Sequence, residues 1–261
     1  MKIEINELLK GLATKIKDRE FYQTEAYVTP FLDRVQKLTD NFEVNVKLPE
    51  QITVTKKEDL DFDNITYNRV WIQAILPSEY TVENHAEVIG MVYGIDTRKP
   101  IVKFYRGGLN MACTNLCVFN PSMLSVQELK PAEAISFSPL DKIMEKAYEI
   151  QKFLKLLRSV TFPRRTDWIN EQLGKWIRNS MHIKYENGFS PVKLGVPTIV
   201  DSYKLLFEDA KSPYYVPSDA ERTDMFNVYN AFTEVISNKD QKDIINKCEK
   251  VLLLKDILDI G

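Results

Sequence analysis

The chain has 261 residues, 44% of them hydrophobic and 28% charged, a composition ordinary for a globular protein with a large buried core. Its 35 basic and 37 acidic residues give a net charge of −2, so whole-chain charge favours no class of partner, and any nucleic-acid or membrane surface must be local. No apolar run reaches the roughly 20 residues of a membrane helix. The first residues carry acids where an export signal would be basic and then apolar. We therefore expect an intracellular protein without a membrane partner.

The hydrophobic period predicts helices, then strands, then helices again. Apolar residues at helical spacing indicate helices over 5–17 and 24–41, and from Phe42 the pattern alternates with period two. The predicted strands cover 42–48, 51–55, 65–76, 85–95, 100–106 and 109–119. After Pro139 the helical period returns. The helices that it predicts cover 140–160, 166–182, 196–208, 220–237 and 239–258.

Strands that follow one another without intervening helices favour an antiparallel sheet. The sequence therefore predicts an α+β fold, in which a central antiparallel sheet over about residues 42–119 is flanked by N-terminal helices and a C-terminal helical half. No long flexible linker separates these parts, so we expect one α+β unit over 1–261. A subdivision into a helix-plus-sheet part, 1–138, and a helical part, 139–261, stays open.

The stretch Cys113-Thr114-Asn115-Leu116-Cys117 is the first candidate site. In a strand its first, third and fifth residues share one face, so two thiols and an amide could converge. A zinc site usually has four ligands, and no second pair at ligand spacing exists. A nucleophilic Cys113 would need a base, which the neighbouring sequence does not supply. Core packing is the favoured interpretation, with reduced, buried thiols, and we expect neither a metal nor another cofactor.

Two further patterns are weaker. Gly107-Gly108 follows a predicted strand and could approach a phosphate, but the full glycine-rich fingerprint is missing, and a β-hairpin turn explains the pair at least as well. His85 and His182 have no partner at catalytic spacing, so both are expected to be surface residues or satisfied polar residues.

A basic tract from Lys152 to Lys184 carries the strongest functional signal. Eight basic residues stand there against Asp167 and Glu171, a local balance of +6 in a chain of −2. Basic side chains neutralise phosphates, and aromatic faces stack on unpaired bases. The residues predicted to bind nucleic acid are Lys155, Arg158, Arg164, Arg165, Trp168, Lys175, Trp176 and Arg178. The alternative is that the tryptophans are core residues and the charges lie on the solvated faces of two helices.

On the predicted helix 220–237, Asn230, Thr233 and Glu234 stand at i, i+3 and i+4 and form one polar patch beside an apolar stripe. Such a patch could bind a ligand, but hydrogen bonds to a neighbouring part of the fold are the better explanation.

Two of these motifs together resemble a known family. Arg106 shortly before Ala112-Cys113-Thr114-Asn115 is similar to the arginine-to-cysteine-x-asparagine strand of a phage- and plasmid-related family, domain of unknown function 932. Tyr229-Asn230-Ala231-Phe232-Thr233-Glu234 is similar to its asparagine-alanine-x-threonine-glutamate helix, so the resemblance covers roughly residues 60–240. The chain departs from the family where Val235-Ile236-Ser237-Asn238 replaces an aromatic-aspartate-histidine ending.

The resemblance implies a mobile genetic element in a bacterium, hence the cytoplasm of the host cell or a virion, and no defined activity. Combined with the basic tract, it favours a non-enzymatic protein that binds single-stranded nucleic acid in replication, recombination or DNA protection. One alternative is a protein-binding role, as an inhibitor of host defence or a virion component, with homo-oligomers allowed. Another is an enzyme centred on Cys113 and Asn115, which would need His85, Asp96 or Glu234 near the thiol.

Overall fold

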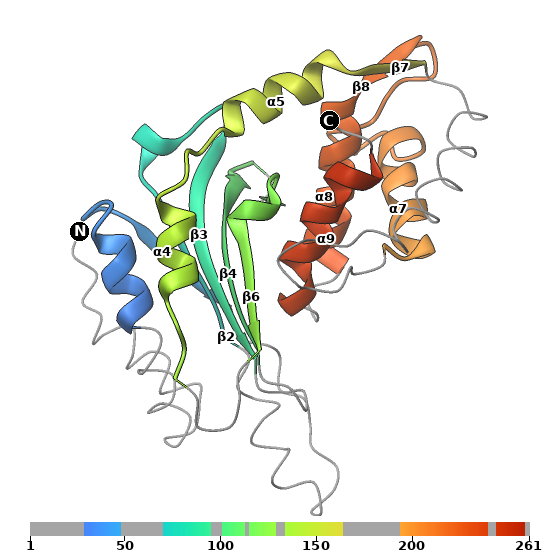
Figure 1. The fold of residues 1–261 in the computed structure, drawn as a ribbon. Coiled ribbons are helices and arrows are strands. Elements are labelled where there is room, and N and C mark those ends of the chain that lie inside the picture. The colour runs from blue at the N-terminus through green and yellow to red at the C-terminus, as the bar shows by residue number, and fades with distance from the viewer. Residues whose placement is uncertain are drawn as a thin grey trace, which may run out of the picture. The chain divides into compact units, whose positions relative to one another are not determined.

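The structure is a computed structural model, and it describes residues 29–47, 70–94, 101–112, 115–128, 134–163, 194–239 and 244–258 (Figure 1). The chain divides into two compact units that are interleaved in sequence. Unit 1 comprises Met1–Thr81, Ala86–Arg106 and Met123–Lys146, and unit 2 comprises Val82–His85, Gly107–Ser122 and Ala147–Gly261.

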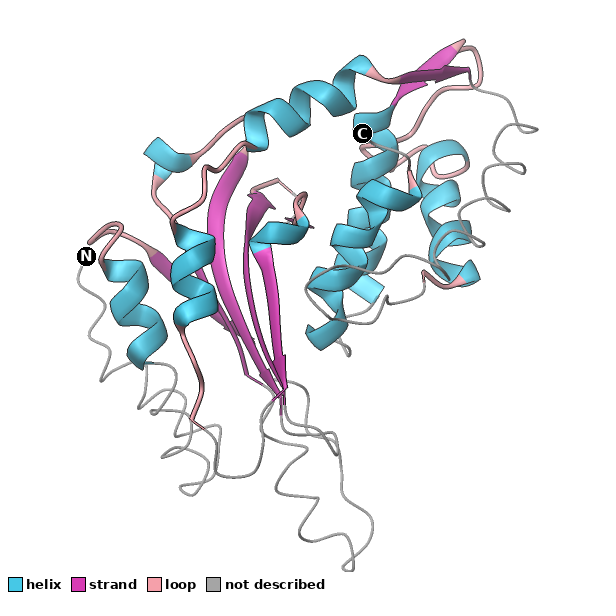
Figure 2. Ribbon diagram, viewed as in Figure 1, coloured by secondary structure: helices cyan, strands magenta, loops and turns pink. Residues whose placement is uncertain are grey.

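A six-stranded antiparallel sheet forms the β part of the fold (Figure 2). Its strands are β1 (Glu43–Lys47), β2 (Val70–Ile75), β3 (His85–Gly94), β4 (Ile101–Asn110), β5 (Leu116–Cys117) and β6 (Leu124–Glu128). The order is β1-β2-β3-β4-β5, and β6 pairs with the first half of β4. The predicted α+β class with an antiparallel sheet is confirmed, and β6 extends the sheet beyond the predicted region.

The glycine pair is placed differently from the prediction. Gly107 and Gly108 lie inside β4 rather than in a hairpin turn, so the turn interpretation is wrong. A Cβ on Gly107 would lie 2.4 Å from the carbonyl oxygen of Cys117, and one on Gly108 would lie 2.4 Å from Cδ1 of Ile150. Close approach of neighbouring atoms therefore explains both glycines. The β4–β5 turn begins at Met111, inside the single strand predicted over 109–119.

The described helices are the segment 29–36 and five named elements. These are α4 (Ser138–Met144), α5 (Ile150–Ser159), α7 (Val196–Phe207), α8 (Met225–Lys239) and α9 (Ile244–Ile257). The single helix predicted over 140–160 is two helices, because the chain leaves helical geometry at 145–149. The helix predicted over 220–237 begins later, since Arg222–Asp224 forms the strand β8, which pairs with β7 (Thr161–Pro163). The short 3-10 turns η2 (Ser78–Tyr80) and η3 (Pro121–Met123) complete the described elements.

In unit 1, helix 29–36 and α4 pack together beside the strands (Figure 1). Arg34 donates to Asp141 on α4 at 2.9 Å, and its guanidinium lies 4.6 Å from the ring centroid of Phe137. Within the sheet, the hydroxyl of Tyr105 donates to Gln73 at 2.8 Å. The buried side chains of Tyr105 and Gln73 thus satisfy each other by a hydrogen bond, as burial requires.

In unit 2, α8 is the central helix and packs against α5, α7 and α9. The carboxylate of Asp224 accepts a hydrogen bond from the backbone N–H of Asn227 at 2.9 Å, which caps the N-terminus of α8. An aromatic cluster joins α5 to α8, with the rings of Phe119 and Phe153 stacked at 5.2 Å and Phe153 edge-on to Tyr229 at 5.3 Å. Because Phe153 packs against Tyr229, this side of α5 faces α8 and is buried.

Candidate functional site

The outer face of α5 carries the described part of the basic tract. Its apolar residues Ile150, Phe153, Leu154 and Leu157 are buried. Lys152 and Lys155 are exposed on the side opposite this buried face. Arg158, three residues further on, is also exposed and lies at the border of the buried face. The helix thus presents a solvent-facing row of positive charge whose orientation is fixed by the buried face.

Two of these three cations have acidic partners. Lys152 forms an ion pair with Glu149 one turn earlier on the chain, and 77% of the lysine side chain is exposed. Arg158 pairs with Glu83 at 3.0 Å, and 50% of the arginine side chain is exposed. Exposed pairs of this kind contribute little stability, about 0–1 kcal/mol, so they do not remove these cations from the surface chemistry.

Arg158 is also held by an aromatic ring. Its guanidinium carbon lies 4.2 Å from the ring centroid of Phe226, the second residue of α8. Its Nε and Nη2 atoms contact the same carboxylate oxygen of Glu83, at 3.2 Å and 3.0 Å. The pair is therefore not the two-oxygen fork that arginine forms with a carboxylate or a phosphate.

The rest of the predicted nucleic-acid set lies outside the described residues. These are Arg164, Arg165, Trp168, Lys175, Trp176 and Arg178, together with His182. Cys113 and Asp96 also lie outside them.

Cys117 is a free, buried thiol. The hydroxyl of Tyr229 donates to its sulfur at 3.1 Å. Burial raises the pKa of Cys117 to about 12, so the thiol stays protonated at neutral pH and is a poor nucleophile. The predicted burial of Cys117 is confirmed. Among the residues that the structure describes, no group of three or more His, Cys, Asp or Glu side chains is placed to hold a metal ion.

The two stretches that carry the family resemblance are joined in unit 2 by a third residue. The side-chain amide of Asn115 donates to the hydroxyl of Tyr214 at 3.3 Å, and that hydroxyl donates to Glu234 at 3.4 Å. Asn230 and Thr233 are buried on the same helix, and the Thr233 hydroxyl donates to the carbonyl oxygen of Asn230 at 3.0 Å. Glu234 and Thr233 thus make hydrogen bonds within the protein, as predicted for this polar patch, and Tyr214 connects Glu234 to Asn115.

Arg106, the remaining residue of the resemblance, is buried in unit 1. Its Nε donates to Glu87 at 2.6 Å, and its Nη1 donates to the carbonyl oxygens of Met144 and Lys146 at 3.1 Å and 2.7 Å. Those carbonyls lie at the C-terminal end of α4, where helical carbonyls have no partner within the helix. Arg106 therefore caps the C-terminal end of α4, and its observed contacts stabilise the fold.

His85 is buried at the start of β3, so the surface alternative for it is wrong. Its Nδ1 lies 3.0 Å from the carbonyl oxygen of Glu83, which makes it a satisfied polar residue. Burial lowers the pKa of His85, although the contact with that carbonyl acts in the opposite direction.

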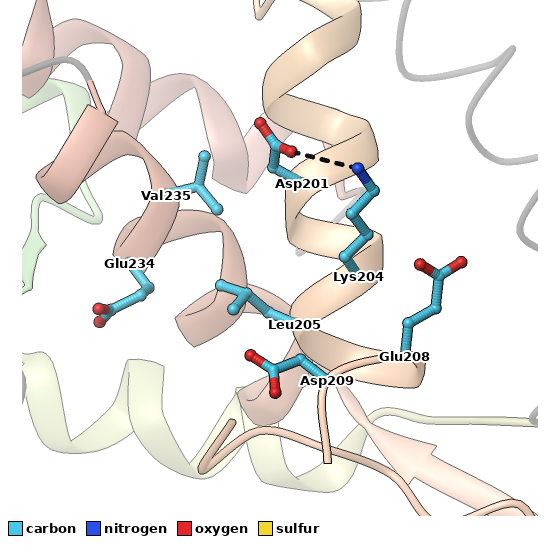
Figure 3. Close-up of a pocket in the computed structure, with 7 residues that line it drawn as sticks. All are labelled: Asp201, Lys204, Leu205, Glu208, Asp209, Glu234 and Val235. Carbon is cyan, nitrogen blue, oxygen red and sulfur yellow. Dashed lines mark ion pairs between the residues drawn. The ribbon is translucent and has the colours of Figure 1, made fainter. Parts of the chain in front are cut away.

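A pocket of about 450 Å³ lies between α7 and α8 in unit 2 (Figure 3). Its lining residues are Asp201, Lys204, Leu205, Glu208, Asp209, Glu234 and Val235. Four of the seven are acidic, but Figure 3 shows their carboxylates pointing in different directions, and Asp201 is 3.9 Å from Lys204. The pocket therefore does not gather its charges around one ligand position.

No protein-family model matches the chain, and neither a curated protein nor a solved structure matches it. Within the described residues, no helix is long and apolar enough to cross a membrane.

Sequence reasoning missed Tyr214, Glu83 and Phe226. Each contributes through a contact with a residue far away in the sequence, 99 positions for Asn115 with Tyr214 and 75 for Glu83 with Arg158. For Glu83 the sequence does contain a signal: the polar pair Glu83-Asn84 stands between two predicted strands and is typical of a tight turn.

Proposed function

We propose that this chain is a non-enzymatic binding protein that engages single-stranded nucleic acid. The observation that carries the proposal is the outer face of α5, where Lys152, Lys155 and Arg158 form an exposed basic row on a helix whose other face is buried. In the sequence the row continues directly into the rest of the basic tract with its two tryptophans. Cations in a row suit a phosphate backbone, and aromatic side chains suit unpaired bases.

The setting proposed for this activity is a phage or plasmid, in replication, recombination or protection of DNA. It rests on the resemblance carried by Arg106, Cys113, Asn115 and the Asn230–Glu234 stretch. A site in the bacterial cytoplasm or a virion follows from the same resemblance.

The direct test is binding of a labelled oligothymidine of about 20 nucleotides by fluorescence anisotropy over a range of salt concentrations. Reversing Lys152 and Lys155 to Glu should lower the affinity. It should also reduce the slope of log affinity against log salt by about 1.4, since each lost contact on a single strand accounts for about 0.7.

The matched control reverses two exposed lysines elsewhere, Lys37 and Lys211, which changes the net charge equally. If the control variant shows the same decrease in the slope of log affinity against log salt, only total charge matters, and α5 is not the binding surface. Absence of binding by the unmodified chain at low salt would defeat the function itself. Reversal of Arg164 and Arg165 extends the test along the tract, and it should weaken binding to all sequences alike.

A protein-binding role is the second candidate, and α7 carries the observation that favours it. Val196 and Val200 stand one turn apart on this helix with 52% and 39% of their surface exposed. Exposed apolar side chains that lie together can mark a protein contact. The partner would be a host defence protein or a virion protein. Self-association through the same side chains is tested by comparing the sedimentation of the unmodified chain with that of Val200→Asp.

A further inference from the structure

We propose that Arg158 is the phosphate-binding residue of α5 and that Glu83 occupies its site as an internal competitor, which the nucleic acid must displace. This inference rests on the proposed function and assigns a mechanism to one position within the basic row.

The first argument is how the guanidinium is held. Phe226 lies against its face at 4.2 Å, while Glu83 contacts only its edge. Departure of Glu83 would leave the stacking contact in place, so the arginine would keep much of its orientation. A planar cation held by an aromatic ring loses less conformational freedom on binding than a free surface lysine does.

The second argument is the form of the ion pair. Two nitrogens on one edge of Arg158 contact a single oxygen of Glu83. A phosphate group could offer each nitrogen its own oxygen, which is the stronger, forked arrangement. The carboxylate therefore fills the position of a phosphate but makes a weaker contact than a phosphate would.

The third argument is the backbone at Glu83. The residue has a φ of 47° and the following Asn84 has a φ of 65°, both in the left-handed region. Asn tolerates that conformation, but Glu is seldom found there. The turn is held by hydrogen bonds between Val82 and His85 in both directions, at 3.0 Å and 2.8 Å. A charged side chain is thus kept at a position that favours Gly, Asn or Asp, and an outlier of this kind points to a role beyond the turn.

The experiment compares Glu83→Gln with the unmodified chain in binding the same labelled oligothymidine, at about 0.15 M salt, where distant charges are screened. Glutamine keeps the size of the side chain and its backbone strain but removes the competing charge. We expect the affinity to rise about two- to fivefold, because the variant no longer has to break an exposed ion pair. The control is Glu221→Gln, which removes one exposed acid of the same unit and should change the affinity far less.

A second pair of variants separates competition from a general charge effect. Arg158→Ala should weaken binding, and in the Arg158→Ala background Glu83→Gln should give no gain. Chemical unfolding of each variant reports any purely structural role of the ion pair.

Binding by the unmodified chain, with no greater gain from Glu83→Gln than from Glu221→Gln, would overturn this inference and leave the proposed function standing. A gain that persists without Arg158 would overturn it as well. If the unmodified chain binds at low salt, binding at about 0.15 M salt only after Glu83→Gln would support the inference in its strongest form. Absence of binding by every variant would defeat both proposals.

Discussion

The buried ion pair between Arg106 and Glu87 offers a test of how unit 1 is held together. Only 10% of the arginine side chain and 4% of the glutamate side chain are exposed, and their atoms lie 2.6 Å apart. Arg106→Met keeps much of the apolar volume but leaves Glu87 buried without its cation. It also removes the donor that the carbonyls of Met144 and Lys146 share at the end of α4.

Removing one partner of a buried ion pair costs about 3–5 kcal/mol of unfolding free energy. We therefore expect a loss of that size at about pH 7, measured by urea denaturation. The double variant Arg106→Met with Glu87→Gln should recover a large part of the loss, because no charge is then left unpaired. The matched control is Arg34→Met, whose partner Asp141 is 46% exposed, and it should cost about 1–2 kcal/mol for the ion pair and the contact with Phe137 together.

The loss should also depend on pH. Burial raises the pKa of Glu87 above its ordinary value of 4.5, while the charge and hydrogen bond of Arg106 act to lower it. Without Arg106 the pKa of Glu87 in the folded chain rises further. When a carboxyl has a higher pKa in the folded chain than in the unfolded chain, the free energy of unfolding increases as the pH falls from the folded pKa to the unfolded value of about 4.5. The deficit of Arg106→Met should therefore shrink as the pH falls from neutral towards about 4.5. A loss below about 1 kcal/mol at neutral pH, or one that Glu87→Gln does not reduce, would refute the reasoning.

Two further predictions concern unit 2. Tyr214→Phe removes the hydroxyl between Asn115 and Glu234, so it should lower the free energy of unfolding by about 1–3 kcal/mol, measured by urea denaturation. The control is Tyr215→Phe, at the next position of the chain, which should cost less. Equal losses in the two variants would argue against the link. Cys117, with a pKa of about 12, should resist alkylation by iodoacetamide in the folded chain and react once urea is added. Mass spectrometry of a Cys113→Ser variant would measure this, and rapid modification of folded Cys117 would contradict its burial.

The class of the fold and most of its elements could be predicted from the sequence. Alternation of period two marks β1 and β2 near their observed bounds, and the spacing of apolar residues marks α7 and α9. These signals are local, because each element buries one face and the sequence must repeat with the period of that element.

Contacts between distant segments could only be decided by the tertiary structure. Gly107 and Gly108 suggested a turn, but they lie in a strand, where Cys117 and Ile150 leave no room for a Cβ. Nothing near Asn115 or Glu234 indicates that the hydroxyl of Tyr214 joins them. Likewise, the pairing of Arg158 with Glu83 depends on a turn that lies 75 residues away in the sequence. Side-chain period reports which face of an element is buried, whereas the identity of the partner depends on how the elements pack.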